Sequence, residues 1–331
     1  LESTVRHSID NAEKGVGGIF EAFDILLLKT LFLIRYIPEI IKGTVDNLAT
    51  LCVDQIDCDK LALKRRIQES LQRLERQSLV SRNGEQWMFL TNEEQDIARE
   101  ISHVAISHDE MSRKLADLVF SQVWKDQTKV RHRDTKADYE FNRIIDGKPF
   151  RNSSHDLSLE IISPLNDEYP MYSDSKCRMY SSAQPGRAIV LLGQGDRLYE
   201  ELRALLQVER YIGEKYDASS HIAKKILLLK KDENREREER LRIQLESLIS
   251  EAACYAQGEP LSIKASSSGT VLDEVVNYLV SNTYTKLAYL KTTPNAFEEI
   301  RAVLTADSIT QQSLLGATDI PNALALGALR E

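Results

Sequence analysis

The feature that most constrains the fold is a helix-forming stretch that runs directly into a two-stranded hairpin. Residues 59–78, DKLALKRRIQESLQRLERQS, carry apolar residues at helical spacing, and Asp57 or Asp59 is suited to cap the helix. Residues 79–90, LVSRNGEQWMFL, place Asn83 and Gly84 between two short apolar runs. Asn-Gly is a strong hairpin signal because both central positions of a type I′ turn require positive φ. The sequence therefore predicts a helix followed by a hairpin that turns at Asn83 and Gly84.

Further helices are predicted on both sides of this pair. Residues 23–36 are apolar on nearly every face and precede Pro38, which indicates a buried helix that ends or bends there. Residues 45–52 can form a short helix after Gly43-Thr44. A fourth helix is predicted to begin at Thr91 or Asn92 and to run through Ile101, because Glu93 and Glu94 follow a suitable capping residue.

Three helices followed by a hairpin is the order of a winged helix-turn-helix domain, with the hairpin as the wing. Such domains place their last helix in the DNA major groove, and a wing can add phosphate contacts. We expect this domain at residues 23–105, after a connecting segment at residues 1–22. In the helix at 59–78, an apolar stripe would face its core; the stripe contains Leu63, Ile67, Leu71 and Leu74.

Basic residues away from that stripe, together with one on the hairpin, are the candidate DNA contacts. They are Lys64, Arg65, Arg66, Arg73, Arg76 and Arg82. Residues 57–85 contain seven Lys and Arg against five Asp and Glu, a surplus of only two, and the whole chain has a net charge of −8. This surplus is small for a DNA reader. The alternative is a solvated face on a domain that packs against other protein.

The remainder of the chain is predicted to be a mixed α/β domain. A helical linker at residues 106–136 contains the basic segment TKVRHRDTK and leads into an α/β domain at residues 137–306. Its expected strands lie in DYEFNRIID, HDLSLEIIS, RAIVLLGQG and LSIKA, and its expected helices cover residues 196–212, 217–257, 271–281 and 294–304. Residues 307–331 would be a truncated or flexible segment. The predicted fold class is therefore α+β and mostly helical, with long helices.

No pattern of catalytic, cofactor-binding or metal-binding residues is found. Gly193-Gln194-Gly195 follows a predicted strand, but a dinucleotide fingerprint would need glycine where Leu198 stands, and no Gly-Lys-Ser/Thr triplet occurs. HExxH and GxSxG motifs are also absent. The four cysteines form no CxxC pair, which favours a reducing cytoplasm over a structural zinc site. No apolar run is long enough to span a bilayer, so we expect no membrane partner.

Two stretches resemble a known family. Residues 32–101, FLIRYIPEIIKGTVDNL…FLTNEEQDIAREI, are similar to the winged-helix segment of BrxC, the large P-loop ATPase of BREX bacteriophage-defence systems that is related to the PglY proteins. Residues 188–216, AIVLLGQGDRLYEELRALLQVERYIGEKY, and the charged helix after them also resemble that family. The resemblance implies a parent ATPase that uses ATP and Mg. No Walker A lysine is present here, so no residue of this chain inherits a nucleotide-binding role.

The resemblance also implies partners. In such systems the parent acts with other BREX proteins, including a methyltransferase and a phosphatase-like protein, and homo-oligomerisation stays open. Our leading hypothesis is a non-catalytic winged-helix and α/β fragment that mediates protein contacts, with weak contacts to double-stranded DNA at most. The alternative is a sequence-specific DNA-binding regulator. An enzyme with a nucleotide site near Gly193–Asp196 ranks last.

Overall fold

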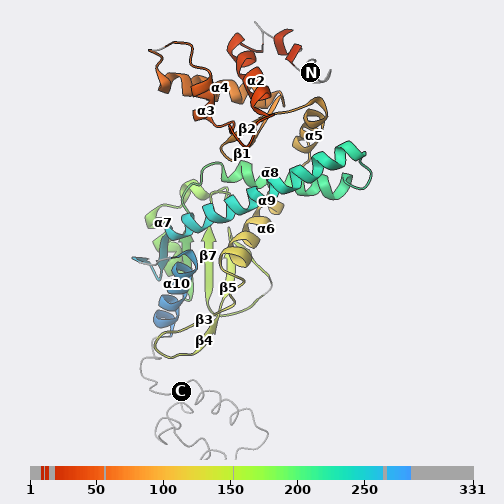
Figure 1. Ribbon diagram of the computed structural model, residues 1–331. Helices are drawn as coiled ribbons and strands as arrows, with labels where there is room; N and C mark the ends of the chain where they lie inside the picture. The colour runs from red at the N-terminus through yellow and green to blue at the C-terminus, as the bar shows by residue number, and fades with distance from the viewer. Residues whose placement is uncertain are drawn as a thin grey trace, which may run out of the picture. The chain divides into compact units, whose positions relative to one another are not determined.

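The computed structural model describes residues 9–10, 12–14, 19–55, 57–151, 153–263 and 267–284. The glycine-rich GVGG segment, the predicted helix at 294–304 and the tail from residue 307 lie outside the described residues. The chain forms two compact units, each built from two separate stretches. The first combines Leu1–Met111 with Arg197–Leu241, and the second combines Ser112–Asp196 with Arg242–Glu331 (Figure 1). The two units alternate along the chain.

The first unit contains three helices at the predicted positions. They are α2 (Ala22–Ile34), α3 (Val45–Leu51) and α4 (Lys60–Arg76). Thr44 caps α3 through the backbone N–H of Asn47, and Asp59 caps α4 through the N–H groups of Leu61 and Ala62. The predicted stripe of α4 is confirmed, since Ile67, Leu71 and Leu74 are fully buried and Leu63 packs beside them at half exposure. These side chains form one core with α2, which is buried on most of its faces.

The hairpin follows α4 directly, but its turn differs from the predicted one. It pairs β1 (Val80–Asn83) with β2 (Gln86–Phe89), so that Val80 lies opposite Phe89 and Asn83 lies opposite Gln86. The turn residues are therefore Gly84 and Glu85. Gly84 alone has positive φ, +60°, which fits a type II′ rather than a type I′ turn. The prediction was wrong because the preference of Asn-Gly yields to the core, where Val80 and Phe89 are buried opposite each other.

A second layer of helices completes the first unit. It contains α5 (Asn92–Ser102), α8 (Leu198–Lys215) and α9 (His221–Ser250), of which the part up to Leu241 belongs here. Thr91 and Glu94 form the predicted capping box at the start of α5. Ile97 and Ile101 of α5 pack with Val208 and Tyr211 of α8 and with Leu227 of α9.

The second unit is built on a six-stranded mixed sheet. The strand order is β10-β9-β8-β7-β5-β6, in which β5, β7 and β8 are parallel and the outer neighbours are antiparallel. The strands are β5 (Asn142–Ile145), β6 (Lys148–Pro149), β7 (Ser158–Ile162), β8 (Arg187–Leu191), β9 (Ala253–Ala256) and β10 (Glu259–Leu261). The strands predicted near β5, β7 and β8 are confirmed, whereas Leu261 is the only described residue of the predicted strand LSIKA that lies in a strand, at the end of β10. The helix predicted to continue to residue 257 ends at Ser250, because the apolar run after it, Ala253–Ala256, is buried as a strand next to β8.

Helices pack against this sheet. α7 (Asp174–Ala183) brings Cys177 against Ile162, Ile189 and Tyr255, and α10 (Ser268–Thr283) contacts β8 and β9. α6 (His108–Asp117) continues into η1 (Leu118–Val123), a π-helix, while η2 (Tyr169–Met171) is a single 3₁₀ turn. No helix in the described part of the chain combines the length and apolar character needed to cross a membrane.

The sequence predicted that the basic segment TKVRHRDTK belongs to a helical linker. The structure shows instead that this segment contains a strand. The helical structure ends at Val123, and β3 (Lys129–Arg131) pairs with β4 (Asp138–Glu140). Lys129 and Arg131 form ion pairs with Glu140 and Asp138 across the two strands. The alternation of buried and exposed side chains explains the strand, because Val130 and His132 are buried between exposed basic residues.

Candidate functional site

The predicted DNA-contacting helix, α4, is held to α2 by a buried carboxylate. Asp24 of α2 is fully buried and accepts hydrogen bonds from Ser70 Oγ at 2.5 Å and from Arg73 Nε and Nη2 at 3.0 and 2.8 Å. The backbone N–H of Glu21 donates to it at 2.8 Å. Burial alone would raise the pKa of Asp24, but these donors, led by Arg73, hold that pKa below its usual value. Arg73 therefore faces α2 and not the solvent side that the helical wheel had predicted.

The other candidate basic residues divide into two groups. Three of them make contacts inside the first unit: Lys64 pairs with Asp46, Arg66 lies over the Phe23 ring at 4.2 Å, and Arg82 donates to the carbonyl of Gly84 at 2.6 Å. Arg65 and Arg76 are exposed and have no hydrogen-bond or ion-pair partner among the described residues. The structure thus brings most of the predicted DNA-binding residues into contacts within the chain.

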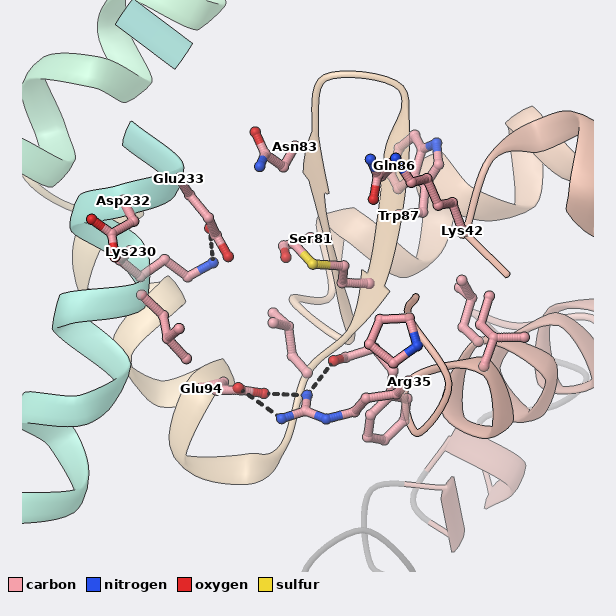
Figure 2. Close-up of a pocket in the computed structure, with 18 of the residues that line it drawn as sticks. Arg35, Lys42, Ser81, Asn83, Gln86, Trp87, Glu94, Lys230, Asp232 and Glu233 are labelled. Carbon is pink, nitrogen blue, oxygen red and sulfur yellow. Dashed lines mark hydrogen bonds and ion pairs between the residues drawn. The ribbon is translucent and has the colours of Figure 1, made fainter. Parts of the chain in front are cut away.

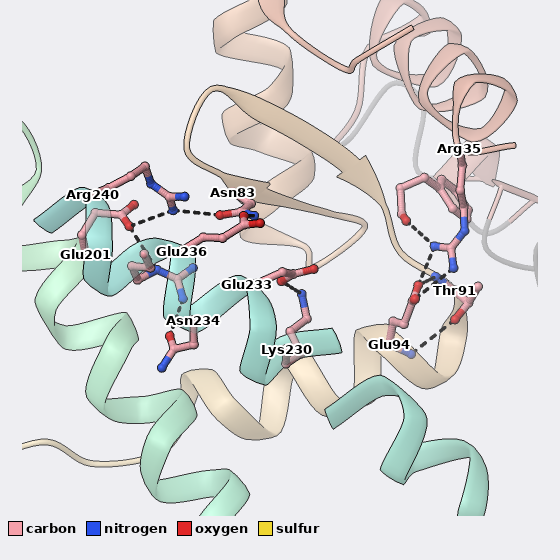
Figure 3. Close-up of polar contacts among 12 residues, drawn as sticks. Arg35, Asn83, Thr91, Glu94, Glu201, Lys230, Glu233, Asn234, Glu236 and Arg240 are labelled. Carbon is pink, nitrogen blue, oxygen red and sulfur yellow. Dashed lines mark hydrogen bonds and ion pairs between the residues drawn. The ribbon is translucent and has the colours of Figure 1, made fainter. Parts of the chain in front are cut away.

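The tip of the hairpin contacts α9 through a single amide. Asn83 Nδ2 donates to Glu236 Oε2 at 2.9 Å, and Asn83 Oδ1 accepts from Arg240 Nη2 at 2.8 Å (Figure 3). A Cβ at Gly84 would lie 3.4 Å from the Arg240 guanidinium carbon, so the turn itself is also close to α9. No local sequence pattern indicates this contact, because Asn83 lies 153 residues before Glu236.

The stretch of α9 that receives the hairpin is anchored on α8. Arg237 Nε donates to Glu201 at 3.0 Å, and its Nη1 donates to Asn234 at 2.7 Å. The buried Asn234 amide donates to the backbone carbonyl of Leu205 at 3.0 Å. Glu236 and Arg240 therefore project toward the hairpin from a helix whose position is fixed by buried polar contacts.

The base of the hairpin is held by a second charged pair. Arg35, just after α2, forms a two-pronged ion pair with Glu94, at 2.6 and 2.9 Å, and its Nη1 also donates to the carbonyl of Phe89 at 2.6 Å (Figures 2 and 3). Burial tends to raise the pKa of Glu94, but the hydrogen bonds from Arg35 and Thr91 lower it below its usual range. Glu94 thus fixes both the start of α5 and the end of α2.

A cavity of about 540 Å³ lies between the hairpin, the end of α2 and α9, all within the first unit (Figure 2). Its wall includes apolar side chains from each element, such as Ile34, Trp87 and Ile226. Its rim carries the Lys230–Glu233 ion pair, with 2.7 Å between charged atoms. Among the described residues, the lining contains neither histidine nor cysteine, and Ser81 supplies its one side-chain hydroxyl. Such a mixture of apolar wall and paired charges suits binding and offers no nucleophile with a base beside it.

The second unit contains a buried charged pair that sequence reasoning missed. Glu160 of β7 is 1% exposed and lies 3.2 Å from Arg187 Nε of β8, while Gly147 N–H donates to it at 3.1 Å. Burial raises the pKa of Glu160 despite the Arg187 charge. The available signal was a glutamate inside the apolar run LSLEIIS. No group of three or more side chains that could ligate a metal occurs in the described ranges.

The Gly193-Gln194-Gly195 segment forms an extended connection after β8 and not a phosphate-binding turn. Neither glycine has positive φ; the left-handed residue is Arg197, at +52°, immediately before α8. Gln244 Nε2 donates to the carbonyl of Asp196 at 2.9 Å, which ties this connection to α9 within the second unit.

Comparison with known families identifies the chain. Residues 104–279 match a family model described as BREX ATP-binding protein BrxC 4th domain with six-stranded beta sheet. The matched region includes residues 188–216, one of the two stretches that carried the resemblance, whereas the hairpin lies before it. The described sheet agrees with the six strands of the second unit. No solved structure gives a significant match. The predicted family is confirmed: this chain belongs to the BREX ATP-binding protein BrxC family.

Proposed function

We propose that this part of a BrxC protein is a non-catalytic interaction region, in which residues 23–105 act as a winged-helix module that contacts protein and not a specific DNA sequence. The order α2, α3, α4 and then the β1-β2 hairpin supports the winged-helix assignment. The family name supports a place in BREX defence against phage, with other BREX proteins as partners. ATP and Mg would serve the parent protein through residues outside this sequence.

The observation that carries the proposal is the use of the basic residues within the chain. Arg73 is bound by the buried Asp24, Arg82 by the hairpin carbonyl of Gly84, and the hairpin tip by α9. A wing that reads DNA needs its tip and its basic side chains available for phosphate. Here those groups hold the module together and attach it to a helical layer of the same unit.

Sequence-specific DNA binding is the second candidate, and the two exposed arginines of α4 are the observation that favours it. Arg65 and Arg76 could each contact phosphate. Specific recognition would need bidentate contacts to base edges, each discriminating by about 1–3 kcal/mol. With Glu69 and Glu75 on the same helix and a net charge of −8, we expect only weak, sequence-independent duplex binding.

Direct binding to the other BREX proteins tests the proposal. We expect the chain to bind at least one of them, the methyltransferase or the phosphatase-like protein among them, with a dissociation constant of about 10 µM or tighter in calorimetry. Arg65→Glu combined with Arg76→Glu should weaken that binding if α4 forms part of the contact surface, while Arg178→Glu in the second unit serves as the matched control. If the chain binds none of the BREX proteins but binds duplex DNA tightly, the proposal is overturned in favour of the second candidate.

A further inference from the structure

The second unit contains a cavity of about 320 Å³ that the proposed function does not use. It lies between α6, the ends of β5 and β6, and the residues that follow β6, entirely inside the region that matches the family model. Three cationic side chains line it, Arg113, Lys148 and Arg151, and the lining contains no carboxylate among the described residues. The lining itself thus carries three cationic groups, of which Arg151 is paired with Asp126 behind the wall.

The remaining wall is apolar and includes an aromatic ring. It is formed by Ala116, Ile145, Pro149 and Phe150, and the Phe150 ring packs on Phe120 with 5.2 Å between centroids. Phe150 is half-buried, so part of its ring is available to the cavity. Cationic groups beside a half-buried aromatic ring favour a ligand with an anionic group and a planar apolar part.

One of the cations, Arg151, is held in place by two linked ion pairs that share Asp126. Arg151 Nη1 donates to Asp126 Oδ2 at 2.6 Å, and the other oxygen of Asp126 accepts from the buried Arg143 at 2.9 Å. The Arg151 guanidinium also lies over the Phe150 ring, 5.1 Å from its centroid. A guanidinium held in this way loses little freedom on binding an anion, which favours affinity.

The backbone around this cavity adopts uncommon conformations. Asp126 and Arg151 have φ of +56° and +60°, and Asp146 has φ of +49° although none of the three is glycine. Phe120 belongs to the π-helix η1. Left-handed non-glycine residues are strained and, like π-helices, concentrate at binding and active sites.

A buried hydroxyl beside the cavity has no partner. Ser112 is 2% exposed, lines the cavity, and its Oγ makes no hydrogen bond with any described residue. Buried hydroxyls are normally paired, so an unpaired one in a cavity wall is unusual. It is a further polar group that a ligand could satisfy after a small adjustment of α6.

We propose that this cavity binds a phosphate monoester attached next to a planar apolar group. The phosphate would lie among Arg113, Lys148 and Arg151, and the planar group would lie against Phe150. A phosphate ester carries up to two negative charges and several acceptor oxygens, which matches three cations better than a single carboxylate does. The volume is at the lower end of ligand pockets, so it fits one ring and one phosphate. Two sources share this chemistry: a free nucleoside monophosphate and the 5′-phosphate end of a nucleic acid strand.

Titration of the full chain with phenyl phosphate tests the proposal. We expect saturable binding with a dissociation constant below about 1 mM, weaker binding of inorganic phosphate, and none of phenol. Lys148→Gln and Arg113→Gln, both at exposed positions, should each weaken phenyl phosphate binding by about tenfold, because each removes a charge-assisted contact. Lys129→Gln, on β3 and outside the cavity lining, is the matched control and should bind like the parent chain.

Two further probes identify the source. Tighter binding of adenosine monophosphate than of phenyl phosphate would indicate a free nucleotide, and tighter binding of a short 5′-phosphorylated oligonucleotide than of its unphosphorylated form would indicate a strand end. Circular dichroism melts that match the parent chain show that the variants are folded. Absence of saturable phenyl phosphate binding, or binding that Lys148→Gln and Arg113→Gln leave unchanged in folded protein, would overturn the proposal.

Discussion

Each unit buries one carboxylate beside an arginine, and the two pairs behave in opposite ways. In the first unit, Asp24 accepts hydrogen bonds from Ser70, Arg73 and the Glu21 backbone, and its pKa is lowered. In the second unit, Glu160 accepts one backbone hydrogen bond, and its pKa is raised by burial. Its Oε2 and the Nε of Arg187 lie 3.2 Å apart, yet neither has a well-directed hydrogen-bond partner among the described residues.

The difference shows that hydrogen-bond geometry, and not proximity of charge, decides whether a buried carboxylate stays ionised without cost. Desolvation acts on both groups, but only Asp24 has enough donors to replace its water. Asp24 therefore serves as the anchor that fixes α4, whereas Glu160 is a poorly compensated charge within the sheet.

The largest effect is expected from Arg73→Ala. The substitution leaves Asp24 buried with its main donor removed, so the free energy of unfolding should fall by about 3–5 kcal/mol. Urea denaturation measures this change. Arg76→Ala, at an exposed position on the same helix, is the control and should change stability by no more than about 0.5 kcal/mol. Equal effects of the two substitutions would contradict the anchoring role of Asp24.

A smaller effect is expected from Arg187→Met in the second unit. Glu160 already has a raised pKa, so it can take up a proton once Arg187 is removed. The free energy of unfolding should therefore fall by only about 1–2 kcal/mol. Met keeps much of the side-chain packing against Tyr180, over which Arg187 lies at 5.0 Å. The same urea experiment applies. A loss as large as that of Arg73→Ala would show that the two pairs are equally well compensated.

Acid titration should give slopes of opposite sign for the two carboxylates. Because the folded pKa of Asp24 is lowered, the unfolded state binds more protons below about pH 4, and the stability contributed by Asp24 is lost as the pH falls. Because the folded pKa of Glu160 is raised, the folded state binds the proton more tightly, and its contribution improves as the pH falls toward about 4.3.

Unfolding measured from about pH 7 down to about pH 3 on two variants checks this sign. The stability advantage of the parent chain over Asp24→Asn should shrink with acid, and its advantage over Glu160→Gln should grow. Slopes of the same sign would refute the contrast.

The smallest effect is expected at the hairpin tip. Asn83→Ala removes the hydrogen bond to Glu236, which is exposed, and the one to Arg240, which is partly buried. The free energy of unfolding should therefore fall by about 1 kcal/mol. Gln86→Ala, opposite Asn83 on β2, offers a nearby control that leaves those bonds intact. Hydrogen exchange of the hairpin amides should quicken in the first variant only. Unchanged exchange in Asn83→Ala would mean that the contact with α9 contributes nothing in solution.

The sequence predicts local elements well and long-range contacts poorly, for physical reasons that particular residues show. The caps at Thr44, Asp59 and Thr91 and the stripe of α4 depend on neighbours within a few residues, and all were found as predicted. The orientation of Arg73 depends on Asp24, which lies 49 residues away, and no helical wheel contains that information.

The wrongly predicted turn and the strand that was not predicted have the same kind of cause, namely pairing with residues that are not neighbours in the sequence. Burial of Phe89 opposite Val80 sets the hairpin register, which overrides the local preference of Asn83-Gly84. Ala253–Ala256 follows a long helix without glycine or proline between them, so only its pairing with β8 reveals it as a strand. The contact of Asn83 with α9 and the cationic cavity of the second unit likewise exist only after the chain has folded.

A titration of mixed-sequence DNA duplexes, followed by fluorescence anisotropy, tests whether most of the basic residues of α4 and the hairpin serve contacts within the chain and leave too few for DNA. Measurements at about 50 mM and about 200 mM salt separate phosphate attraction from specific contacts. We predict a dissociation constant no tighter than about 1 µM at the higher salt, with no preference among duplexes. Tight binding that persists at the higher salt, prefers one duplex and disappears in an Arg65→Ala, Arg76→Ala variant would contradict the account.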